Sequence, residues 1–276
     1  MPVLLFVLWL FVPMALAGQP APAALAPVHT YSIVARDPDT GDMGVAVQSH
    51  WFSVGQLVAW GEAGVGVVAT QSFIDPSYGS LGLALMKAGR SATEALTGLV
   101  AADPHPQVRQ VAMLDATGNV AVHTGANCIP FAGHLVGENF AVQANLMLDE
   151  AVWTTMAEAF QRARGDLAER LLAALQAAQD LGGDLRGKQS AAILIVRGKA
   201  TGRPWVDRAM DLRVEDHPDP VQELKRLVRL HRAYEHMNRG DLAIESGDEE
   251  TALQEYAAAE ALFPDNLEMR FWHAVS

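Results

Sequence analysis

The chain has 276 residues, of which 50% are hydrophobic and 19% are charged. This composition predicts a packed globular protein and excludes extensive disorder. The formal net charge of −12 argues against nucleic acid or an anionic membrane as the main partner, because surfaces that bind phosphate need basic residues. Cys128 is the only cysteine, and the nine histidines form no HExxH motif, so we expect no disulfide, no metal and no cofactor.

Residues 1–17 are typical of a secretory signal peptide. Residues 3–17 form a continuous apolar run that ends in small residues, and the run contains Pro13 and is short for a membrane span. No Lys or Arg precedes it, which leaves an uncleaved anchor as the alternative. Residues 18–29 are rich in Pro and Ala and are predicted to be a linker. We therefore expect an exported protein, periplasmic or extracellular.

The stretch after the linker predicts a β-hairpin. Residues 30–35 and 43–48 are rich in β-branched and apolar residues, and the PDTG sequence at 38–41 is typical of a turn. With the turn centred in that sequence, Thr30 lies across from Ser49, and cross-strand partners share a face of the sheet. The hairpin therefore brings two hydroxyl groups together at its open end.

The chain continues with strands, two helices, strands, two helices and strands. The predicted strands cover residues 57–60, 65–70, 108–114, 120–124, 140–144, 191–196 and 205–214. The predicted helices cover residues 80–87, 150–164, 167–181 and 221–237. A further helix begins at the N-cap Ser91, with Glu94 completing a capping box. This order predicts an α+β domain over residues 30–217, with two sheets packed between helix layers.

Residues 218–276 form a predicted helical tail. From about residue 234 the tail resembles a tetratricopeptide repeat, a helical hairpin in which small residues allow close packing. The residues in register with the repeat are Gly240, Ala252, Tyr256, Ala259 and Pro264. Because one repeat cannot bury its own apolar face, the tail is predicted to be either a cap on the main domain or a docking surface for a protein partner or a second copy of the chain.

Six motifs in the same order resemble a known family. They are YSIVARDPDTGDMGVAVQS, AGVGVVATQ, HTGANC, AGH, VQANLM and RGKQSAA. Through them residues 30–231 resemble an uncharacterised branch of the N-terminal nucleophile (Ntn) hydrolases called domain of unknown function 1028. The resemblance implies a four-layer αββα sandwich of Ntn-hydrolase type, followed here by a small all-α segment. For activity it implies amide hydrolysis as a class, without a settled substrate.

In Ntn hydrolases the first residue of the mature chain is the nucleophile and its free α-amino group is the base. By motif the matching residue is Thr30. An α-amino group has a pKa of about 7.7–8.0, so a useful fraction is neutral at working pH. Cleavage after Ala17 would leave residues 18–29 in front of Thr30, so the mechanism needs a second cut between His29 and Thr30. Without that cut, Thr30 is an ordinary strand residue.

Helper residues are predicted near the same strand ends. Ser49 is expected to assist Thr30, and Asn145 is the candidate for stabilising the oxyanion. The region offers no lysine between Thr30 and Lys87, so the helper set of the proteasome branch is absent. A direct dyad of Ser49 with His50 would need the strand to end between them, because neighbouring strand residues point to opposite faces.

Binding residues are predicted in the adjoining loops. His50 and Trp51 are expected to line the mouth of the pocket, and Thr70 and Gln71 either hold a substrate carbonyl or amide or cap their strand. Three residues ahead of the strand at 191–196 are weaker candidates: Asp184, Gln189 and Ser190. Cys128 is predicted to be a buried apolar residue, because no charged partner lies near it in the sequence.

Two functions are compatible with these observations. The first is an exported Ntn-type amidohydrolase that acts on a small amide through Thr30. The second is a non-catalytic ligand-binding or scaffolding protein whose helical tail recognises a partner. The N-terminus of the mature chain distinguishes them, because only the first requires a chain that begins at Thr30.

Overall fold

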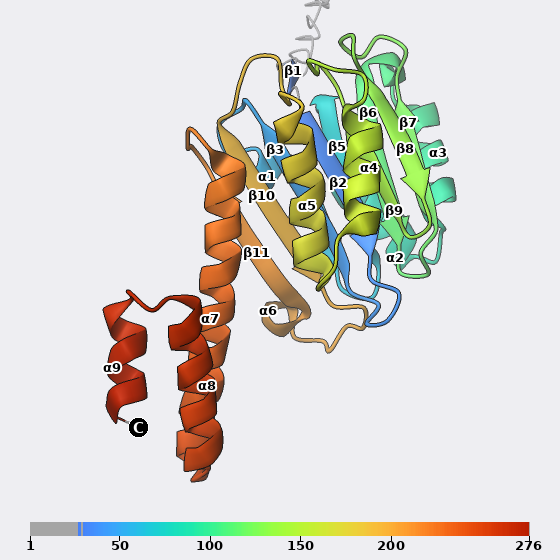
Figure 1. Cartoon of the computed structure of the whole chain (residues 1–276). Helices are drawn as coiled ribbons and strands as arrows, with labels where there is room; N and C mark the ends of the chain where they lie inside the picture. The colour runs from blue at the N-terminus through green and yellow to red at the C-terminus, as the bar shows by residue number, and fades with distance from the viewer. Residues whose placement is uncertain (1–26, 29, 276) are drawn as a thin grey trace, which may run out of the picture.

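The computed structural model describes residues 27–28 and 30–275 (Figure 1). The predicted signal peptide and nearly all of the predicted linker lie outside the described residues. Within the described part, every helix is too short or too polar to cross a membrane.

Two antiparallel sheets form the body of the protein. The first sheet has the order β1-β5-β6-β7, with β4 also paired to β5. Its strands are β1 (Pro27–Val28), β4 (Ala59–Glu62), β5 (Gly66–Phe73), β6 (Arg109–Asp115) and β7 (Val120–Thr124). The second sheet has the order β11-β10-β3-β2-β9-β8. Its strands are β2 (Thr30–Arg36), β3 (Met43–Ser49), β8 (Gly133–Gly137), β9 (Phe140–Ala144), β10 (Ser190–Val196) and β11 (Arg208–Val214).

Helices cover the outer face of each sheet. α2 (Ser77–Lys87) and α3 (Ala92–Ala102) pack on the first sheet, and α4 (Val152–Arg162) and α5 (Leu167–Asp180) pack on the second. Short helices α1 (Gly55–Val58) and α6 (Pro204–Asp207) precede β4 and β11, and a 3-10 turn at Pro106–Val108 precedes β6. Figure 1 shows β1 at the upper end of the sheets and α6 at the lower end. The predicted mixture of antiparallel sheets and helices is therefore confirmed.

The register of the first hairpin is as predicted. Thr30 pairs with Ser49 across β2 and β3, and Ser49 pairs with Ser190 across β3 and β10. The turn is closed by Asp37, whose Oδ1 accepts hydrogen bonds from the backbone N–H groups of Asp39 (2.9 Å) and Thr40 (3.0 Å). An aspartate that binds the backbone two residues on is a common way to fix such a turn.

Alternation along the strands gives three apolar cores in the body. Val34, Val45 and Val47 face the first sheet and pack between the sheets against Val67 and Leu114. The other face of each sheet packs against its own helices. Because side chains alternate between faces, strands covered on both sides are apolar along their length.

Asp115 joins the first sheet to α3. It is 6% exposed, and its carboxylate accepts hydrogen bonds from the N–H of Ala92 (2.9 Å), from the N–H and hydroxyl of Thr117 (3.0 and 2.6 Å) and from the N–H of Asn119 (3.1 Å). Burial acts to raise the pKa of Asp115, but these hydrogen bonds to the charged form outweigh it and hold the pKa below its ordinary value.

Two predicted strands were wrong in part, and one strand was not predicted. Residues 57–60 were predicted as a strand, whereas α1 occupies residues 55–58 and β4 begins at residue 59. Val54 and Val58 are both buried there, which places them on one face of a helical turn. Residues 204–207 form α6 rather than the start of a strand, and β8 was not predicted because it is a half-exposed edge strand bounded by glycines.

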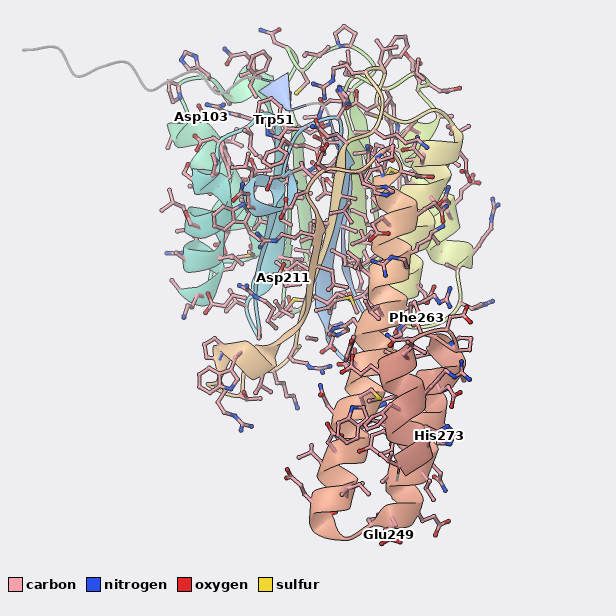
Figure 2. All side chains as sticks on the ribbon, turned by 90° about the vertical axis from the view of Figure 1, so that its left-hand side faces the viewer. Trp51, Asp103, Asp211, Glu249, Phe263 and His273 are labelled. Carbon is pink, nitrogen blue, oxygen red and sulfur yellow. The ribbon has the colours of Figure 1, made fainter. Side chains whose placement is uncertain are left out.

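The helical tail consists of α7 (Pro220–Ser246), α8 (Glu249–Leu262) and α9 (Leu267–Val275). The predicted end of the first helix at residue 237 was wrong, since α7 continues to Ser246 and ends at Gly247, which has a φ of 79°. The first half of α7 packs on β10, β11 and α5. The second half projects beyond the sheets with α8 and α9, as Figure 2 shows with Glu249 at the far tip.

Small residues allow the tail helices to pack closely. A Cβ on Gly240 would lie 2.6 Å from the ring of Tyr256, so the ring packs directly on the α7 backbone. The Tyr256 hydroxyl donates to Asp241 Oδ1 (2.7 Å), and burial together with this carboxylate raises the pKa of Tyr256 to about 12. The core of this hairpin contains only tail residues among those described.

Candidate functional site

The space between the sheets is polar at the end where β2 begins. Side chains that face this space from six strands, and from the residue after β9, are fully buried there. They are Thr30, Ser32, Ser49, Gln71, Gln110, Gln143, Asn145 and Ser190, all 0% exposed. Burying polar groups is unfavourable unless they are hydrogen-bonded. The buried polar side chains at the Thr30 end therefore need hydrogen-bond partners within the protein.

Three hydroxyl groups lie in a row across neighbouring strands. Thr30, Ser49 and Ser190 occupy paired positions on β2, β3 and β10. The Thr30 hydroxyl donates to Ser49 Oγ at 3.2 Å. Ser190 Oγ donates to the carbonyl of Trp51 and accepts from the N–H of Val54 (3.1 Å). Ser190 therefore fixes the loop after β3 at the end of the row.

Four side-chain amides tie the two sheets together beside Thr30. We call Gln71, Gln110, Gln143 and Asn145 the amide cluster. Gln71 Nε2 donates to the carbonyl of Thr30 (3.1 Å) and to Gln110 Oε1 (2.8 Å). Ser32 donates to Gln71 Oε1 (2.7 Å). Because Gln71 and Gln110 lie on the first sheet and Thr30 on the second, these bonds hold the start of β2 in place.

Gln110 is the centre of the amide cluster. Its Nε2 lies within hydrogen-bond distance of the carbonyls of Ala144 (2.9 Å) and Gly133 (3.2 Å) and of Thr124 Oγ1 (3.1 Å). Its Oε1 also accepts from Asn145 Nδ2 (2.9 Å). The donors and acceptors of one side chain thus connect β6 and β7 to β8 and β9.

Two acceptor atoms of the cluster are buried without a hydrogen-bond partner among the described residues. They are Asn145 Oδ1 and Gln143 Oε1. Asn145 follows β9, and its backbone N–H donates to the carbonyl of Thr30 (3.1 Å), so its side chain lies next to the predicted nucleophile. Buried acceptors without partners are uncommon, and each calls for a physical reason. Asn145 Oδ1 can accept a hydrogen bond from a group near Thr30.

His50 and Trp51 lie directly beyond β3 and are half-buried. The N–H of His50 donates to Asp184 Oδ2 (3.0 Å), and its ring Nδ1 lies 3.4 Å from the carbonyl of Lys188. Asp184 is 2% exposed and pairs with Arg186 Nη2 at 2.8 Å. Asp184 therefore anchors the loop that carries His50 and Trp51. Figure 2 places Trp51 at the upper end of the sheets, the end at which β1 lies in Figure 1.

Thr70 and Gln71 lie on opposite faces of β5. Gln71 joins the amide cluster, whereas the Thr70 hydroxyl donates to the carbonyl of Asp75 (3.2 Å) on the side covered by α2. The structure therefore brings together Thr30, Ser49, Gln71 and Asn145, and not Thr70.

Cys128 is 8% exposed, and burial raises the pKa of its thiol. A thiol with a raised pKa is protonated at neutral pH, and the nucleophilic form of cysteine is the thiolate. Nothing in its surroundings therefore favours Cys128 as a nucleophile.

Ser32, Gln110 and Gln143 were missed in the sequence. Each is a polar residue within an otherwise apolar strand, and the sequences SIVA, QVAML and AVQAN contain them. Their shared feature is that polar residues replace apolar ones at positions that face the other sheet. That pattern could have identified Gln143, which lies two residues before Asn145, but the pairing of the sheets was needed to connect it with Gln110.

The chain before Thr30 lies against the first sheet. Pro27 pairs with Phe73 and Val28 with Ser72 at the end of β5. Thr30 itself is 0% exposed, and its nitrogen is part of a peptide bond. The backbone before Thr30 therefore occupies the edge of β5 beside the polar interior.

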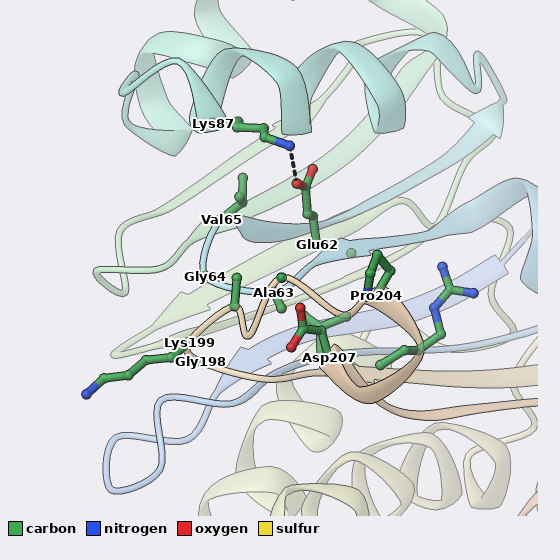
Figure 3. A pocket seen from close by; sticks show the side chains of 14 residues that line it. Glu62, Ala63, Gly64, Val65, Lys87, Gly198, Lys199, Pro204 and Asp207 are labelled. Carbon is green, nitrogen blue, oxygen red and sulfur yellow. Dashed lines mark hydrogen bonds and ion pairs between the residues drawn. The ribbon is translucent and has the colours of Figure 1, made fainter.

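A cavity of about 730 Å³ lies elsewhere (Figure 3). It is lined by the β4–β5 turn and by the loop after β10, with Lys87 Nζ paired to Glu62 Oε1 at 2.6 Å. Val196, at the opposite end of β10 from Ser190, lines it. We place the candidate site at the Thr30 end because the buried polar groups are there. The described residues hold no cluster of three His, Cys, Asp or Glu side chains able to bind a metal ion.

Comparisons with known proteins identify the family of the chain but not its activity. A family model described as "Family of unknown function (DUF1028)" matches residues 30–224. The chain is similar to the crystal structure of protein SPO2555 from Silicibacter pomeroyi, designated DUF1028, with 30% identity and a TM-score of 0.65 over 73% of this chain and 88% of that one. Anbu (ancestral beta-subunit) from Yersinia bercovieri matches with 12% identity and a TM-score of 0.35 over 68% and 89%, too low to support a conclusion. No curated protein matches the chain.

Proposed function

The chain belongs to the DUF1028 family, whose function is unknown, and we propose that this protein is an Ntn-type hydrolase of small amides. The observation that carries the proposal is the position of Thr30. Its hydroxyl lies at the start of a central strand, 3.2 Å from Ser49 Oγ, and its carbonyl is held by Gln71 and Asn145. A hydroxyl placed this rigidly beside a second hydroxyl supports a role as nucleophile.

The proposed reaction begins with hydrolysis of the peptide bond between His29 and Thr30. One water is consumed, and the new α-amino group of Thr30 has a pKa of about 7.7–8.0, so its neutral form can act as a base. Thr30 Oγ then attacks the carbonyl carbon of the substrate amide, and its proton passes to the amino group. The amino group of Thr30 passes this proton to the nitrogen of the substrate, the C–N bond breaks, and the amine leaves. A second water hydrolyses the ester on Thr30 and releases the acid.

Asn145 and Ser49 are the proposed helpers. Asn145 Oδ1 is a buried acceptor without a partner among the described residues, and we assign it to hold the free amino group of Thr30. The N–H groups of Asn145 are engaged by Gln110 and by the carbonyl of Thr30, so it acts as an acceptor in this role rather than as the predicted oxyanion donor. Ser49 Oγ, within hydrogen-bond distance of Thr30 Oγ1, orients the nucleophile.

Removal of residues before Thr30 would also open the substrate site. Pro27 and Val28 pair with the end of β5, so their departure would free a strand edge next to Thr30. His50 and Trp51, in the adjoining loop, are proposed to line this opening.

The remaining parts of the proposal concern architecture and location. We assign the body to a four-layer αββα sandwich of the Ntn type over residues 30–217, with α2 and α3 on one side and α4 and α5 on the other. The tail, residues 218–276, is proposed to be a single tetratricopeptide-like hairpin that docks a protein partner or a second copy. Export to the periplasm or the extracellular space is proposed from the apolar segment at residues 1–17.

The experiment compares Thr30→Ala and Thr30→Ser with the unaltered protein on a panel of small amides. Thr97→Ala is the matched control, because Thr97 is exposed on α3. The proposal expects no turnover for Thr30→Ala, partial turnover for Thr30→Ser, and unchanged turnover for Thr97→Ala. Equal turnover by Thr30→Ala and the unaltered protein would contradict it.

A non-catalytic binding protein is the second candidate function. It is favoured by one observation, which is that Thr30 in the intact chain is fully buried and preceded by backbone paired to β5. In that state Thr30 has no free amine. A mature protein that keeps residues before Thr30, and that binds an amide without hydrolysing it, would support this function.

A further inference from the structure

Four exposed apolar side chains lie at the same end of the sheets as the candidate site. Phe52 (61% exposed), Phe131 (48%), Leu148 (52%) and Leu185 (55%) lie in loops at the end of the sheets where Thr30 lies. We call them the apolar rim. Large apolar side chains on a surface are ordinary when scattered, but a group of them on adjoining loops indicates a binding surface.

The loops of the apolar rim are bonded to one another. The N–H of Leu148 donates to the carbonyl of Gly183 (3.2 Å), and the N–H of Leu185 donates to the carbonyl of Leu146 (3.2 Å). The N–H of Met147 reaches the carbonyl of Phe131 (3.4 Å). The loop of Phe52 joins them because Asp184, next to Leu185, accepts from the N–H of His50, two residues before Phe52. The four loops that carry the rim are thus joined to one another.

Backbone strain is concentrated in the same region. Ser53, Phe131 and Leu146 have φ values of 58°, 58° and 55°, and Ser72, at the end of β5, has a φ of 69°. Non-glycine residues in the left-handed region cost on the order of 1 kcal/mol each and tend to cluster at functional sites. Two of these residues, Phe131 and Leu146, are themselves large and apolar. The strain therefore falls on loops that carry the rim and on one rim residue, Phe131.

Three of the four residues of the apolar rim are connected to the polar interior by short segments. Leu148 lies three residues after Asn145, Phe52 lies three residues after Ser49, and Leu185 lies five residues before Ser190. The carbonyl of Ser49 also accepts from the N–H of Gln189, which continues the loop of Leu185. The rim is therefore positioned by the same strand ends that position Thr30.

We infer that the apolar rim binds the apolar acyl group of the substrate amide. The inference rests on the proposed function and names its substrate class, an amide of an uncharged aliphatic or aromatic acid. The exposed area of the four side chains supports a small occupant. At about 200 Å² for each side chain, roughly half exposed, the rim presents about 400 Å². A stable protein interface needs about 800 Å² from each partner.

The experiment measures binding separately from hydrolysis. The probes are octanamide and acetamide, titrated into the chain produced with residue 30 as its first residue and carrying Thr30→Ala, so that residues 27–28 are absent and no turnover interferes. The rim variants are Leu148→Ser and Leu185→Ser, and Leu253→Ser is the control, because Leu253 is an exposed leucine on α8. Each rim variant is expected to weaken octanamide binding about tenfold, from the loss of part of a leucine contact. Acetamide binding is expected to be unchanged.

The outcomes separate this inference from the proposed function. Hydrolysis by the unaltered protein that is independent of acyl length and of the rim variants would overturn the inference and leave the Thr30 hydrolase standing. Octanamide binding that depends on the rim, without hydrolysis of any amide, would support the rim and overturn the hydrolase. A dimer that becomes monomeric in the rim variants, measured by sedimentation velocity, would assign the rim to contact between copies and overturn the inference.

Discussion

Replacing Gln110 with leucine removes the centre of the amide cluster while keeping a side chain of similar volume. The substitution removes Nε2, whose two N–H bonds point among three acceptors on Ala144, Gly133 and Thr124, and it removes Oε1, which accepts from Gln71 and Asn145. All of these groups surround a residue that is 0% exposed, so water cannot replace the lost partner without entering the interior.

The expected loss of stability in Gln110→Leu depends on which hydrogen bonds the former partners of Gln110 keep. Gln71 Nε2 keeps its bond to the carbonyl of Thr30, whereas Asn145 Nδ2 keeps only a 3.5 Å contact with the same carbonyl. A net hydrogen bond contributes about 1 kcal/mol, and a buried group left unpaired costs about 1–3 kcal/mol. We therefore expect Gln110→Leu to lower the free energy of unfolding by about 3–5 kcal/mol, out of a typical total of about 5–15 kcal/mol.

The assay is reversible urea unfolding at 25 °C followed by circular dichroism. Gln161→Leu is the matched control, because Gln161 is exposed on α4, and it should change the free energy of unfolding by less than about 0.5 kcal/mol. If Gln110→Leu were as stable as Gln161→Leu, the hydrogen bonds assigned to the cluster would not hold the sheets together. The reasoning about the polar interior would then be refuted.

The other predictions concern the loop after β3, acid stability and the tail. Ser190→Ala should speed hydrogen exchange of the Val54 amide, which loses its acceptor, and unchanged exchange would contradict the role of Ser190. Although burial acts to raise the pKa of Asp115, its hydrogen bonds lower it, so its stabilisation is present above the unfolded pKa of about 4 and is lost as pH falls through the lower native value. Asp115→Asn should therefore cost about 2 kcal/mol at pH 7 and progressively less below pH of about 4, measured by urea unfolding at several pH values; a cost independent of pH would contradict this. Gly240→Leu should expose the tail to limited proteolysis and leave the body folded, because a Cβ would meet the Tyr256 ring at 2.6 Å, and a tail as resistant as the original would contradict this. Gly98→Ala, where a Cβ meets nothing within 4 Å, is the control and should stabilise α3 by about 0.5–1 kcal/mol.

Local patterns predicted the parts of the fold that depend on neighbouring residues. The PDTG turn fixed the register of the first hairpin, and Ser91 with Glu94 forms the predicted capping box of α3. The end of α7 was predicted too early because the helix continues through the point at which the sequence begins to resemble a repeat. The apolar contacts of the tail stabilise it there, and a pattern based on helix length does not include them.

The candidate site could be predicted only in part, because it is assembled from both sheets. Thr30 and Ser49 were identified together since one hairpin contains both. Gln110 is 80 residues away from Thr30 in the numbering, and only the packing of the sheets brings it to the carbonyl network around Thr30. Thr70 was grouped with Gln71 as its neighbour, although neighbouring strand residues point to opposite faces. The strained loops that carry Phe131 and Leu146 have no signature in the sequence.

The N-terminus of the mature protein tests the central claim most directly. The protein is purified from its native compartment, and its intact mass and N-terminal sequence are measured. The account predicts a chain that begins at Thr30 with a free amino group. A stable mature chain that retains His29 or any residue before it would contradict the Thr30 mechanism, since the base that the mechanism requires would not exist.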